Sequence, residues 1–470
     1  MVLKRFTSSI FIFATTVGSA TAASPDVLLD RSFGQGGIAL LREPSPWALV
    51  SIRAIRFAAD GSIFVGGTHN GYLVVEPYVL KLDGDGDVDP AFGTNGLFSL
   101  PLDYETYPGA TMGDIALLGD GRIAFTAGLL DINFMYLTRS TSLIGLLTAS
   151  GQLDTQWSGI GYREFAYGEP NFGLTFGHRG VLAIDGADHV YLSDHSGTGT
   201  NGVARFRSDG TLDPGYGANG IAWLPEGVAL ERVRLDGSGR LWGAGPAASA
   251  NLPTRLASTR LLPNGQLDAS YGGGLILSDV ASTLHEAVVP GSFAFDGEGR
   301  PVVGFAVQDW EAGRMGTLDI ARYTNTGDLD DSFNADQQHG AVPGIARIAL
   351  GGSERPYVYA EPLSDGGILV IGHIDWIRTG VTISRLHRDA TTDVTLPNAP
   401  DGYPSTMPLL GQGDRDVVMA SETDADGRVV MAGVTHDGTR SCLFVLRLIG
   451  DRLFADGQDP GDRPTSCPAP

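Results

Sequence analysis

The chain has 470 residues, of which 42% are hydrophobic and 18% charged, and its formal net charge is −22 at pH 7. The hydrophobic content is sufficient for a folded core and argues against a largely disordered chain. The negative charge argues against the clustered Lys and Arg that bind a phosphate backbone, so we expect no nucleic-acid partner.

The first 22 residues carry the three-part pattern of a secretory signal peptide. Lys4 and Arg5 give a positive start, residues 8–18 form a short apolar stretch, and residues 20–22 provide small residues for cleavage. The alternative is a buried or anchoring N-terminal helix, but the stretch is too short to span a bilayer comfortably. We therefore expect residues 1–22 to be removed and the mature chain to be secreted or periplasmic, with no later membrane span.

A short phrase then recurs along the chain, and we call it the LD phrase. Its copies begin at residues 29 (LDRSFGQGG), 88 (VDPAFGTNG), 153 (LDTQWSGIG), 212 (LDPGYGANG), 267 (LDASYGGG) and 329 (LDDSFNADQQHG). A seventh copy, near residues 391–402, is barely recognisable. We expect the Asp to cap a turn, glycine to supply positive φ, and the aromatic residue to pack between neighbouring sheets.

An Asp/Gly turn that leads into a β-rich run lies between successive LD phrases. These runs are residues 60–67, 120–128, 185–194, 236–245, 296–305, 365–372 and 426–433. Asp-Gly between β-type runs is a strong hairpin signal, and no long segment shows helical periodicity. The pattern therefore predicts four short strands in each unit. The first strand comes directly after the LD phrase, as in residues 37–41.

Units of about 60 residues with four strands correspond to one blade of a propeller. The sequence thus predicts an all-β fold, a seven-bladed β-propeller of four-stranded antiparallel blades. It occupies residues 23–450, after the signal peptide at 1–22 and before a C-terminal tail at 451–470. In this arrangement the LD phrase joins the last strand of one blade to the first strand of the next.

The LD phrases at 29, 88 and 212, together with the Asp/Gly turns at 60 and 120, resemble the delta-60 repeat proteins of exported bacterial chains. The resemblance covers nearly the whole mature chain. It implies a propeller-like β-architecture and no established activity. Two departures are clear, since Trp157-Ser158 replaces the aromatic-glycine pair in the third copy and the seventh copy has decayed.

The connections of each unit fall on two ends of its sheet. In an antiparallel sheet, successive connections alternate between the two ends. The Asp/Gly turns and the LD phrases are alternate connections, so they share one end. The variable connections share the other end, which we call the irregular face. Its aromatic residues are the candidate binding residues, because exposed aromatics on loops are favoured anchors: Trp47, Tyr72, Tyr104, Tyr107, Phe134, Tyr136, Trp310 and Trp376. The alternative is that they merely cover blade edges.

Few residues point to chemistry. Asp83, Asp85 and Asp87 have the spacing of a calcium loop, but Val88 and Thr94 occupy the positions that an EF-hand gives to Gly and Glu. They are weak metal candidates, and a polar hairpin is the alternative. The sequence contains no nucleophile elbow and no phosphate-binding P-loop. We therefore predict no catalytic residue, no resident metal and no cofactor.

The chain has two cysteines, Cys442 in an apolar run and Cys467 in the tail. In an oxidising compartment such a pair is expected to form a disulfide, which would fix the tail to the fold. Two free thiols are the alternative.

These observations favour an exported, monomeric binding module that takes an unknown protein or glycan on its irregular face. The alternatives are a propeller hydrolase or lyase acting on carbohydrate, and a calcium-stabilised surface scaffold. Several acids with an Arg or His in the central channel would favour the enzyme. A flat aromatic irregular face would favour the binding module.

Overall fold

The structure is a computed structural model that describes residues 29–42, 49–70, 75–102, 109–133, 136–166, 180–195, 201–249, 252–309, 317–337, 342–349, 357–373, 381–392, 405–407, 417–436 and 441–449. These residues form 28 β-strands and one short 3-10 turn, Gly272–Gly274. The fold is all-β, as predicted. No helix in the described ranges has the length and hydrophobicity to cross a membrane.

The strands form six sheets, five of four strands and one of eight. The eight-stranded sheet contains β2 (Leu49–Phe57), β3 (Ile63–Asn70), β4 (Val75–Leu82), β5 (Leu97–Ser99), β6 (Gly109–Leu117), β7 (Ile123–Asn133), β8 (Tyr136–Leu147) and β9 (Tyr162–Phe165). It consists of two antiparallel groups, β2–β5 and β6–β9, joined by a single parallel pair between Val75 and Gly109.

The next three sheets follow the chain in order. They are β10 (Val181–Ile184), β11 (Val190–His195), β12 (Asn201–Phe206) and β13 (Ile221–Trp223); β14 (Arg232–Leu235), β15 (Leu241–Ser249), β16 (Leu252–Leu261) and β17 (Leu275–Ser278); and β18 (Glu286–Phe295), β19 (Pro301–Asp309), β20 (Thr317–Arg322) and β21 (Ile345–Ala349). Antiparallel pairing joins neighbouring strands throughout these sheets.

The last two sheets differ in how they are completed. One is β22 (Tyr357–Pro362), β23 (Ile368–His373), β24 (Val381–Leu386) and β25 (Ser405–Met407). The other combines β26 (Val417–Thr423), β27 (Val429–His436) and β28 (Ser441–Arg447) with β1 (Ile38–Arg42). Since β1 pairs antiparallel with β28, the two ends of the described chain meet in one sheet.

The strand that follows each LD phrase is not the first strand of a new sheet, and here the sequence-based prediction was wrong. β5 follows the phrase at 88–96 and pairs with β4, which precedes the phrase. The phrase turns the chain back on itself, because Lys81 donates its backbone N–H to Gly96 O across the turn. The strand after the phrase is therefore the last strand of the same sheet. Each sheet thus ends one strand later in the chain than predicted.

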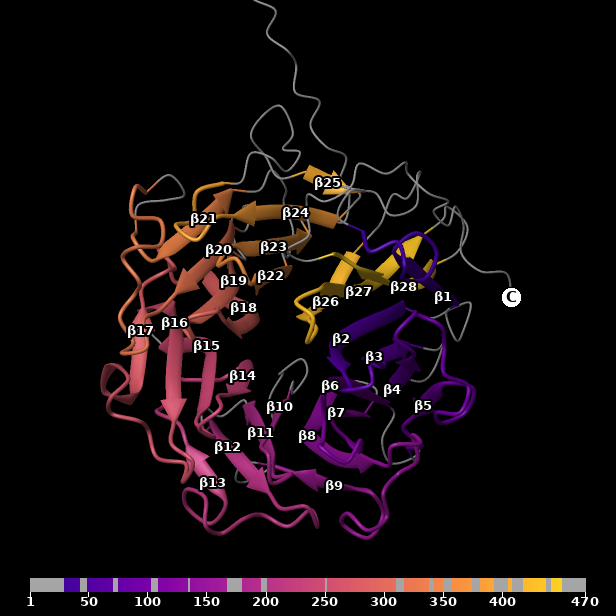
Figure 1. Ribbon diagram of the computed structural model, residues 1–470. Coiled ribbons are helices and arrows are strands. Elements are labelled where there is room, and N and C mark those ends of the chain that lie inside the picture. The colour runs from indigo at the N-terminus through magenta and orange to yellow at the C-terminus, as the bar shows by residue number, and fades with distance from the viewer. Residues whose placement is uncertain are drawn as a thin grey trace, which may run out of the picture.

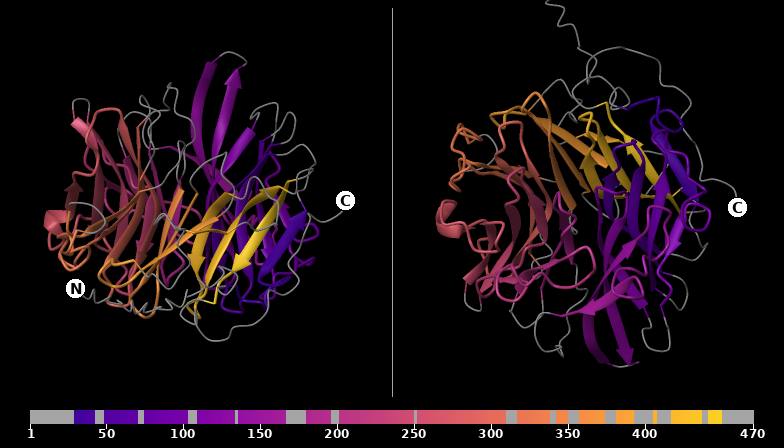
Figure 2. Two further views of the ribbon diagram at one scale, coloured as in Figure 1. Left: turned by 90° about the horizontal axis from the view of Figure 1, so that it is seen from above. Right: turned by 60° about the horizontal axis from the view of Figure 1, so that its bottom comes forward.

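The sheets surround a common centre (Figure 1). The first strand of each group, which runs into an Asp/Gly turn, lies innermost and packs against the next first strand. These contacts run β2–β6, β6–β10, β10–β14, β14–β18, β18–β22, β22–β26 and β26–β2. The β7–β8 hairpin extends beyond the other sheets at one end (Figure 2).

The LD phrase locks neighbouring sheets together through one recurring contact, which we call the junction contact. In one copy, Asp330 Oδ1 accepts the backbone N–H of Ser332 at 3.0 Å, and Asp330 Oδ2 accepts Nε of Arg322 at 2.8 Å. Arg322 lies 4.6 Å above the ring of Phe333 and donates Nη1 to Arg388 O. Residue 388 lies in the turn between the third and fourth strands of the next sheet. One guanidinium therefore contacts an Asp, an aromatic ring and the backbone of a neighbouring sheet.

The same contact recurs around the molecule. Arg260 pairs with Asp268 beside Tyr271, Arg205 with Asp213 beside Tyr216, and Arg447 with Asp30 beside Phe33. All these aromatic rings are fully buried. The expected turn cap, positive-φ glycines and buried aromatic are thus confirmed, for example at Gly220 (φ 95°).

Two copies of the junction contact deviate. Lys81 replaces the arginine and bonds to Asp89 at 2.8 Å. In the third copy, Leu146 occupies the arginine position, and Arg122 reaches Asp154 from the Asp/Gly turn at 3.3 Å. Trp157 is nevertheless buried and packs on Phe206, so this junction keeps its apolar half.

The Asp/Gly turns and LD phrases lie at one end of the sheets, as predicted. Arg300, just after an Asp/Gly turn, bonds to Asp330 of an LD phrase at 2.9 Å. Arg428 approaches Asp30 in the same way. The irregular face is therefore at the opposite end.

Several sequence-based predictions fall outside the described residues. These are the signal peptide at 1–22, the tail at 451–470 and Cys467. Cys442 is buried in β28, where it faces Arg42 of β1. Its bridge to Cys467 remains a prediction.

Replacing Arg322 with Met should destabilise the protein by about 3 kcal/mol, because it leaves Asp330 as a nearly buried carboxylate without its main partner. Arg207→Met is the matched control, since that side chain is 49% exposed and bonds to Asp213 at 3.3 Å; its cost should stay below about 1 kcal/mol. Urea unfolding of both variants provides the measurement. Equal losses would show that the junction contact adds nothing beyond a surface ion pair.

Candidate functional site

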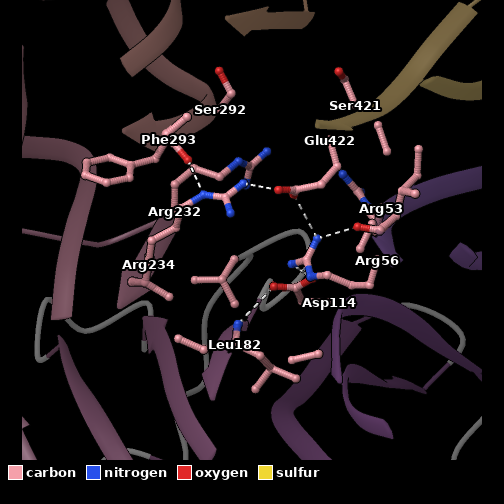
Figure 3. Close-up of a pocket in the computed structure, with 18 of the residues that line it drawn as sticks. Arg53, Arg56, Asp114, Leu182, Arg232, Arg234, Ser292, Phe293, Ser421 and Glu422 are labelled. Carbon is pink, nitrogen blue, oxygen red and sulfur yellow. Dashed lines mark hydrogen bonds and ion pairs between the residues drawn. The ribbon is translucent and has the colours of Figure 1, made fainter. Parts of the chain in front are cut away.

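A cavity of about 360 Å³ lies among the first strands (Figure 3). These strands surround the centre of the molecule (Figure 1). Its lining comes from β2, β6, β10, β14, β18, β22 and β26. On each strand the lining residues are those closest to the Asp/Gly turn. The cavity is therefore nearer the regular turns than the irregular face.

In each first strand, the last residue that pairs with the second strand lies six positions before its partner, as Phe57 does with Ile63 and Leu235 with Leu241. This constant offset across the Asp/Gly turns defines equivalent positions in all the first strands. One position before this pair lies a ring of equivalent residues. It contains Arg56, Ala116, Ala183, Arg234, Ala294, Glu361 and Glu422. Two cations and two carboxylates share this level with three alanines, whose small side chains leave the central space open.

Glu422 is held between two arginines at this level. Its Oε1 accepts Nη2 of Arg234, and its Oε2 lies 3.5 Å from Nη1 of Arg56. Arg234 comes from β14, which faces β26 across the centre (Figures 1 and 3), so the ion pair crosses the channel. The negative charge of Glu422 raises the pKa of Arg234 above its ordinary value. The side chain of Arg234 is 38% exposed despite its central place, because it borders the cavity.

Asp114 anchors the other side of Arg56. Its Oδ1 lies 2.7 Å from Arg56 Nη2 and also accepts the backbone N–H of Ile115. Its Oδ2 accepts the backbone N–H of Leu182 at 2.9 Å. Burial raises the pKa of Asp114 despite the opposing charge of Arg56. With both oxygens engaged, Asp114 orients Arg56 rather than facing a ligand.

Arg232 differs from the other cations of the cavity. Its Nε donates to Gly291 O at 2.7 Å, and its Nη1 donates to Glu231 O at 2.6 Å. Within the described ranges it pairs with no carboxylate. Its guanidinium is thus oriented by neutral backbone oxygens while its charge stays available. Arg53 is a fourth arginine in the lining.

Glu361 is the most buried acid of the cavity, at 3% exposure. Its two oxygens accept the hydroxyls of Ser421 at 2.9 Å and Thr423 at 3.0 Å. Burial, and then the negative charge of Glu422, raise the pKa of Glu361 to about 7. Glu361 therefore keeps its proton until the pH rises to about 7, whereas Glu422 is paired with two arginines.

The structure leaves most of the predicted binding aromatics undescribed. Trp47, Tyr72, Tyr104, Tyr107, Phe134, Trp310 and Trp376 lie outside the described residues, and Tyr136 is described only as the first residue of β8. Their role on the irregular face remains a hypothesis.

The weak metal candidates form a turn. Asp83 Oδ1 accepts the backbone N–H of both Asp85 and Asp87 at 3.0 and 2.9 Å. In the part of the chain that the structure describes, no group of three or more His, Cys, Asp or Glu could hold a metal ion. The geometry agrees with the polar hairpin that was the alternative.

The charged residues of the cavity were missed from the sequence, because up to 366 residues separate partners such as Arg56 and Glu422. A signal was nevertheless present. Aligned on the Asp/Gly turns, the repeat shows Arg, Ala or Glu at one inward position where a purely structural repeat would keep one residue type.

The family comparison supports the fold. Residues 58–92 and 182–216 match a family model described as "Domain of unknown function (DUF5122) beta-propeller". Both segments end on a junction aromatic, Phe92 and Tyr216. Two segments of the chain thus resemble a β-propeller family. No curated protein matches the sequence significantly.

Similar solved structures are distant. They include the polysaccharide lyase Uly1 (TM-score 0.48, 10% identity, 87% of this chain and 99% of that chain). A glucose dehydrogenase gives a TM-score of 0.38 at 11% identity, over 87% and 99% of the two chains. The GH43 endo-arabinanase from Bacillus licheniformis gives 0.33 at 13% identity, over 86% and 95%. At these values the structures say nothing about the ligand of this chain.

The raised pKa of Glu361 predicts how stability depends on pH. Between its ordinary value of 4.5 and about 7, the folded protein keeps a proton that the unfolded chain releases. Stability should therefore fall as pH rises through this window, by at most about 3 kcal/mol from this group. Glu361→Gln should flatten the dependence in urea unfolding across the window. An unchanged slope would mean that Glu361 is already ionised in the folded protein.

Proposed function

We propose that the chain is an exported seven-bladed β-propeller of the delta-60 repeat type that binds a small anionic ligand in its central cavity. One observation carries the proposal: four arginines line a single cavity in a chain whose formal net charge is −22. Local positive charge in an acidic protein attracts and orients an anion.

The seven-bladed ring is supported by the strand contacts. If β2–β5 and β6–β9 are separate blades joined by one parallel pair, the strands group into seven units of four. The first strands then form a closed cycle of packing contacts, in which β26 returns to β2. The pairing of β1 with β28 joins the ends of the chain in the last blade. Recurrence of Asp30, Asp89, Asp154, Asp213, Asp268 and Asp330 supports the delta-60 assignment.

The cavity sets limits on the ligand. A volume of about 360 Å³ lies at the small end of the range for ligand pockets, so a molecule of monosaccharide size fits it. Arginine binds carboxylate and other oxyanions through paired N–H donors. Arg232 forms no ion pair with a described carboxylate. We therefore take Arg232 as the anchor of the ligand's anionic group.

A carbohydrate hydrolase or lyase is the second candidate. Three acids with arginines in the central channel are the arrangement that favours an enzyme, and the raised pKa of Glu361 suits a general acid. However, Glu422 is held by two arginines and Glu361 by two hydroxyls, which leaves binding as the better supported function. New reducing ends released from a polysaccharide, and lost in Glu361→Gln, would favour the enzyme.

The irregular face remains a second proposed surface, for a protein or glycan partner of a monomeric module. A calcium-stabilised scaffold has less support, because Asp83 caps its own turn. Export rests on the signal-peptide pattern of residues 1–22.

Ligand binding can be tested with D-glucuronate and, as the matched neutral molecule, D-glucose. Isothermal titration should detect glucuronate and not glucose. Arg232→Gln should weaken binding at least about tenfold, since it removes a charge-assisted contact. Arg207→Gln, on the exposed turn before an LD phrase, is the matched control. Equal binding of both sugars, or an unaffected Arg232→Gln variant, would refute an anion site.

Export and the disulfide can be tested on one sample. Protein purified from a bacterial periplasm should begin at about Ala23, and its intact mass should lack the two thiol hydrogens. Cys467→Ser leaves the buried Cys442 in place and should cost about 3–4 kcal/mol in urea unfolding. A full-length N-terminus or two free thiols would contradict this proposal.

A further inference from the structure

We propose that the central cavity is a carboxylate site in which Glu422 is an internal ligand that the external carboxylate displaces. The inference rests on the proposed function and adds the chemical class of the ligand and the way it enters.

The arrangement around Glu422 is that of a bound carboxylate. One oxygen meets the guanidinium of Arg234 and the other meets that of Arg56, so each oxygen has its own cation. Arg56 is in turn fixed by Asp114, and Arg234 by the backbone oxygen of Phe293. The two guanidinium groups are therefore oriented before any ligand arrives, and they suit a planar, two-oxygen acceptor.

This ion pair can exchange its carboxylate at little cost. The side chains of Arg234, Arg56 and Glu422 are 38%, 28% and 15% exposed, because they border the cavity. An ion pair that solvent reaches contributes little to stability. A ligand carboxylate that takes the place of Glu422 replaces one charge-assisted contact with another of the same kind, while Glu422 returns to the solvent of the cavity.

The surroundings leave room for the rest of the ligand. Ala116, Ala183 and Ala294 share the ring level of the two arginines and fill little of it. Arg232 lies two residues before Arg234 on β14, and side chains two apart on a strand point to the same face. Arg232 can therefore capture the incoming anion next to the position where it displaces Glu422.

The uncharged part of the ligand meets polar groups. The cavity is also lined by Ser292, Ser421 and Tyr359. Below pH 7 Glu361 carries a proton and adds no second repelling charge there. A small molecule with one carboxylate and a hydroxylated body matches these groups, and D-glucuronate has this chemistry.

The test compares the glucuronate affinity of a Glu422 variant with that of variants at Glu298 and Glu361. Glu422→Gln removes the internal carboxylate and should tighten glucuronate binding about tenfold in isothermal titration. Glu298→Gln makes the same change on an exposed turn outside the cavity and should leave binding unaltered. Circular dichroism and thermal melting of each variant verify that it is folded.

Glu361→Gln separates displacement from general electrostatics. Above pH 7 Glu361 is ionised, so its neutralisation removes one negative charge from the same ring level without breaking a direct ion pair to a described arginine. Displacement predicts that Glu422→Gln tightens binding clearly more than Glu361→Gln does at that pH. Equal tightening by both variants, or weaker binding by Glu422→Gln, overturns the inference.

The outcomes also distinguish this inference from the proposed function. Wild-type binding of glucuronate without any gain in Glu422→Gln overturns displacement and leaves the anion site intact. Binding by Glu422→Gln alone supports displacement, since the internal ligand then blocks the site. No binding by either protein overturns both, and inorganic sulfate bound in place of glucuronate overturns the choice of a carboxylate.

Discussion

The fold depends on the junction contact, in which a basic side chain near the end of a sheet's third strand binds the Asp of the LD phrase. In its full form the guanidinium also covers an aromatic ring and reaches the turn between the third and fourth strands of the next sheet, as Arg322 does with Asp330, Phe333 and Arg388 O. A four-stranded sheet cannot bury both of its faces alone. The buried ring and, in the full form, the bridging arginine let each sheet supply the apolar cover of the next, which explains why the LD phrase recurs along the chain.

Local patterns allowed much of this fold to be predicted from the sequence. The Asp/Gly turns and the LD phrase act within a few residues, so their strands, turn caps and buried aromatics could be read directly. Strand partnership could not, because β5 pairs with the strand before its phrase and begins no new sheet. Turn chemistry indicates that a chain reverses direction; it does not indicate which of two neighbouring sheets receives the strand.

The candidate site was hidden for a different reason. Arg56, Arg234, Glu361 and Glu422 lie on four different first strands, and each has an ordinary place in an alternating β pattern. Only the closing of the strands around one centre brings them together. Sequence analysis gave weight to the aromatics of the variable connections, which stand out locally, whereas the cavity consists of charged residues distributed one per strand at equivalent positions.

An alternative role for this charged network is stability alone, through ion pairs between opposite sides of the cavity. Two features argue against that. The Arg234–Glu422 pair borders a cavity, where solvent weakens its contribution, whereas the junction arginines Arg260 and Arg322 are buried with their acids. In addition, Arg232 is oriented by two backbone oxygens and forms no ion pair with a described carboxylate, so it stabilises no sheet contact through an ion pair. The LD phrases that begin at residues 29, 88, 153, 212, 267 and 329 all keep their Asp and their buried aromatic ring, because neighbouring sheets need this cover. The inner ring varies from strand to strand, as expected of residues that meet a ligand with a different group on each side.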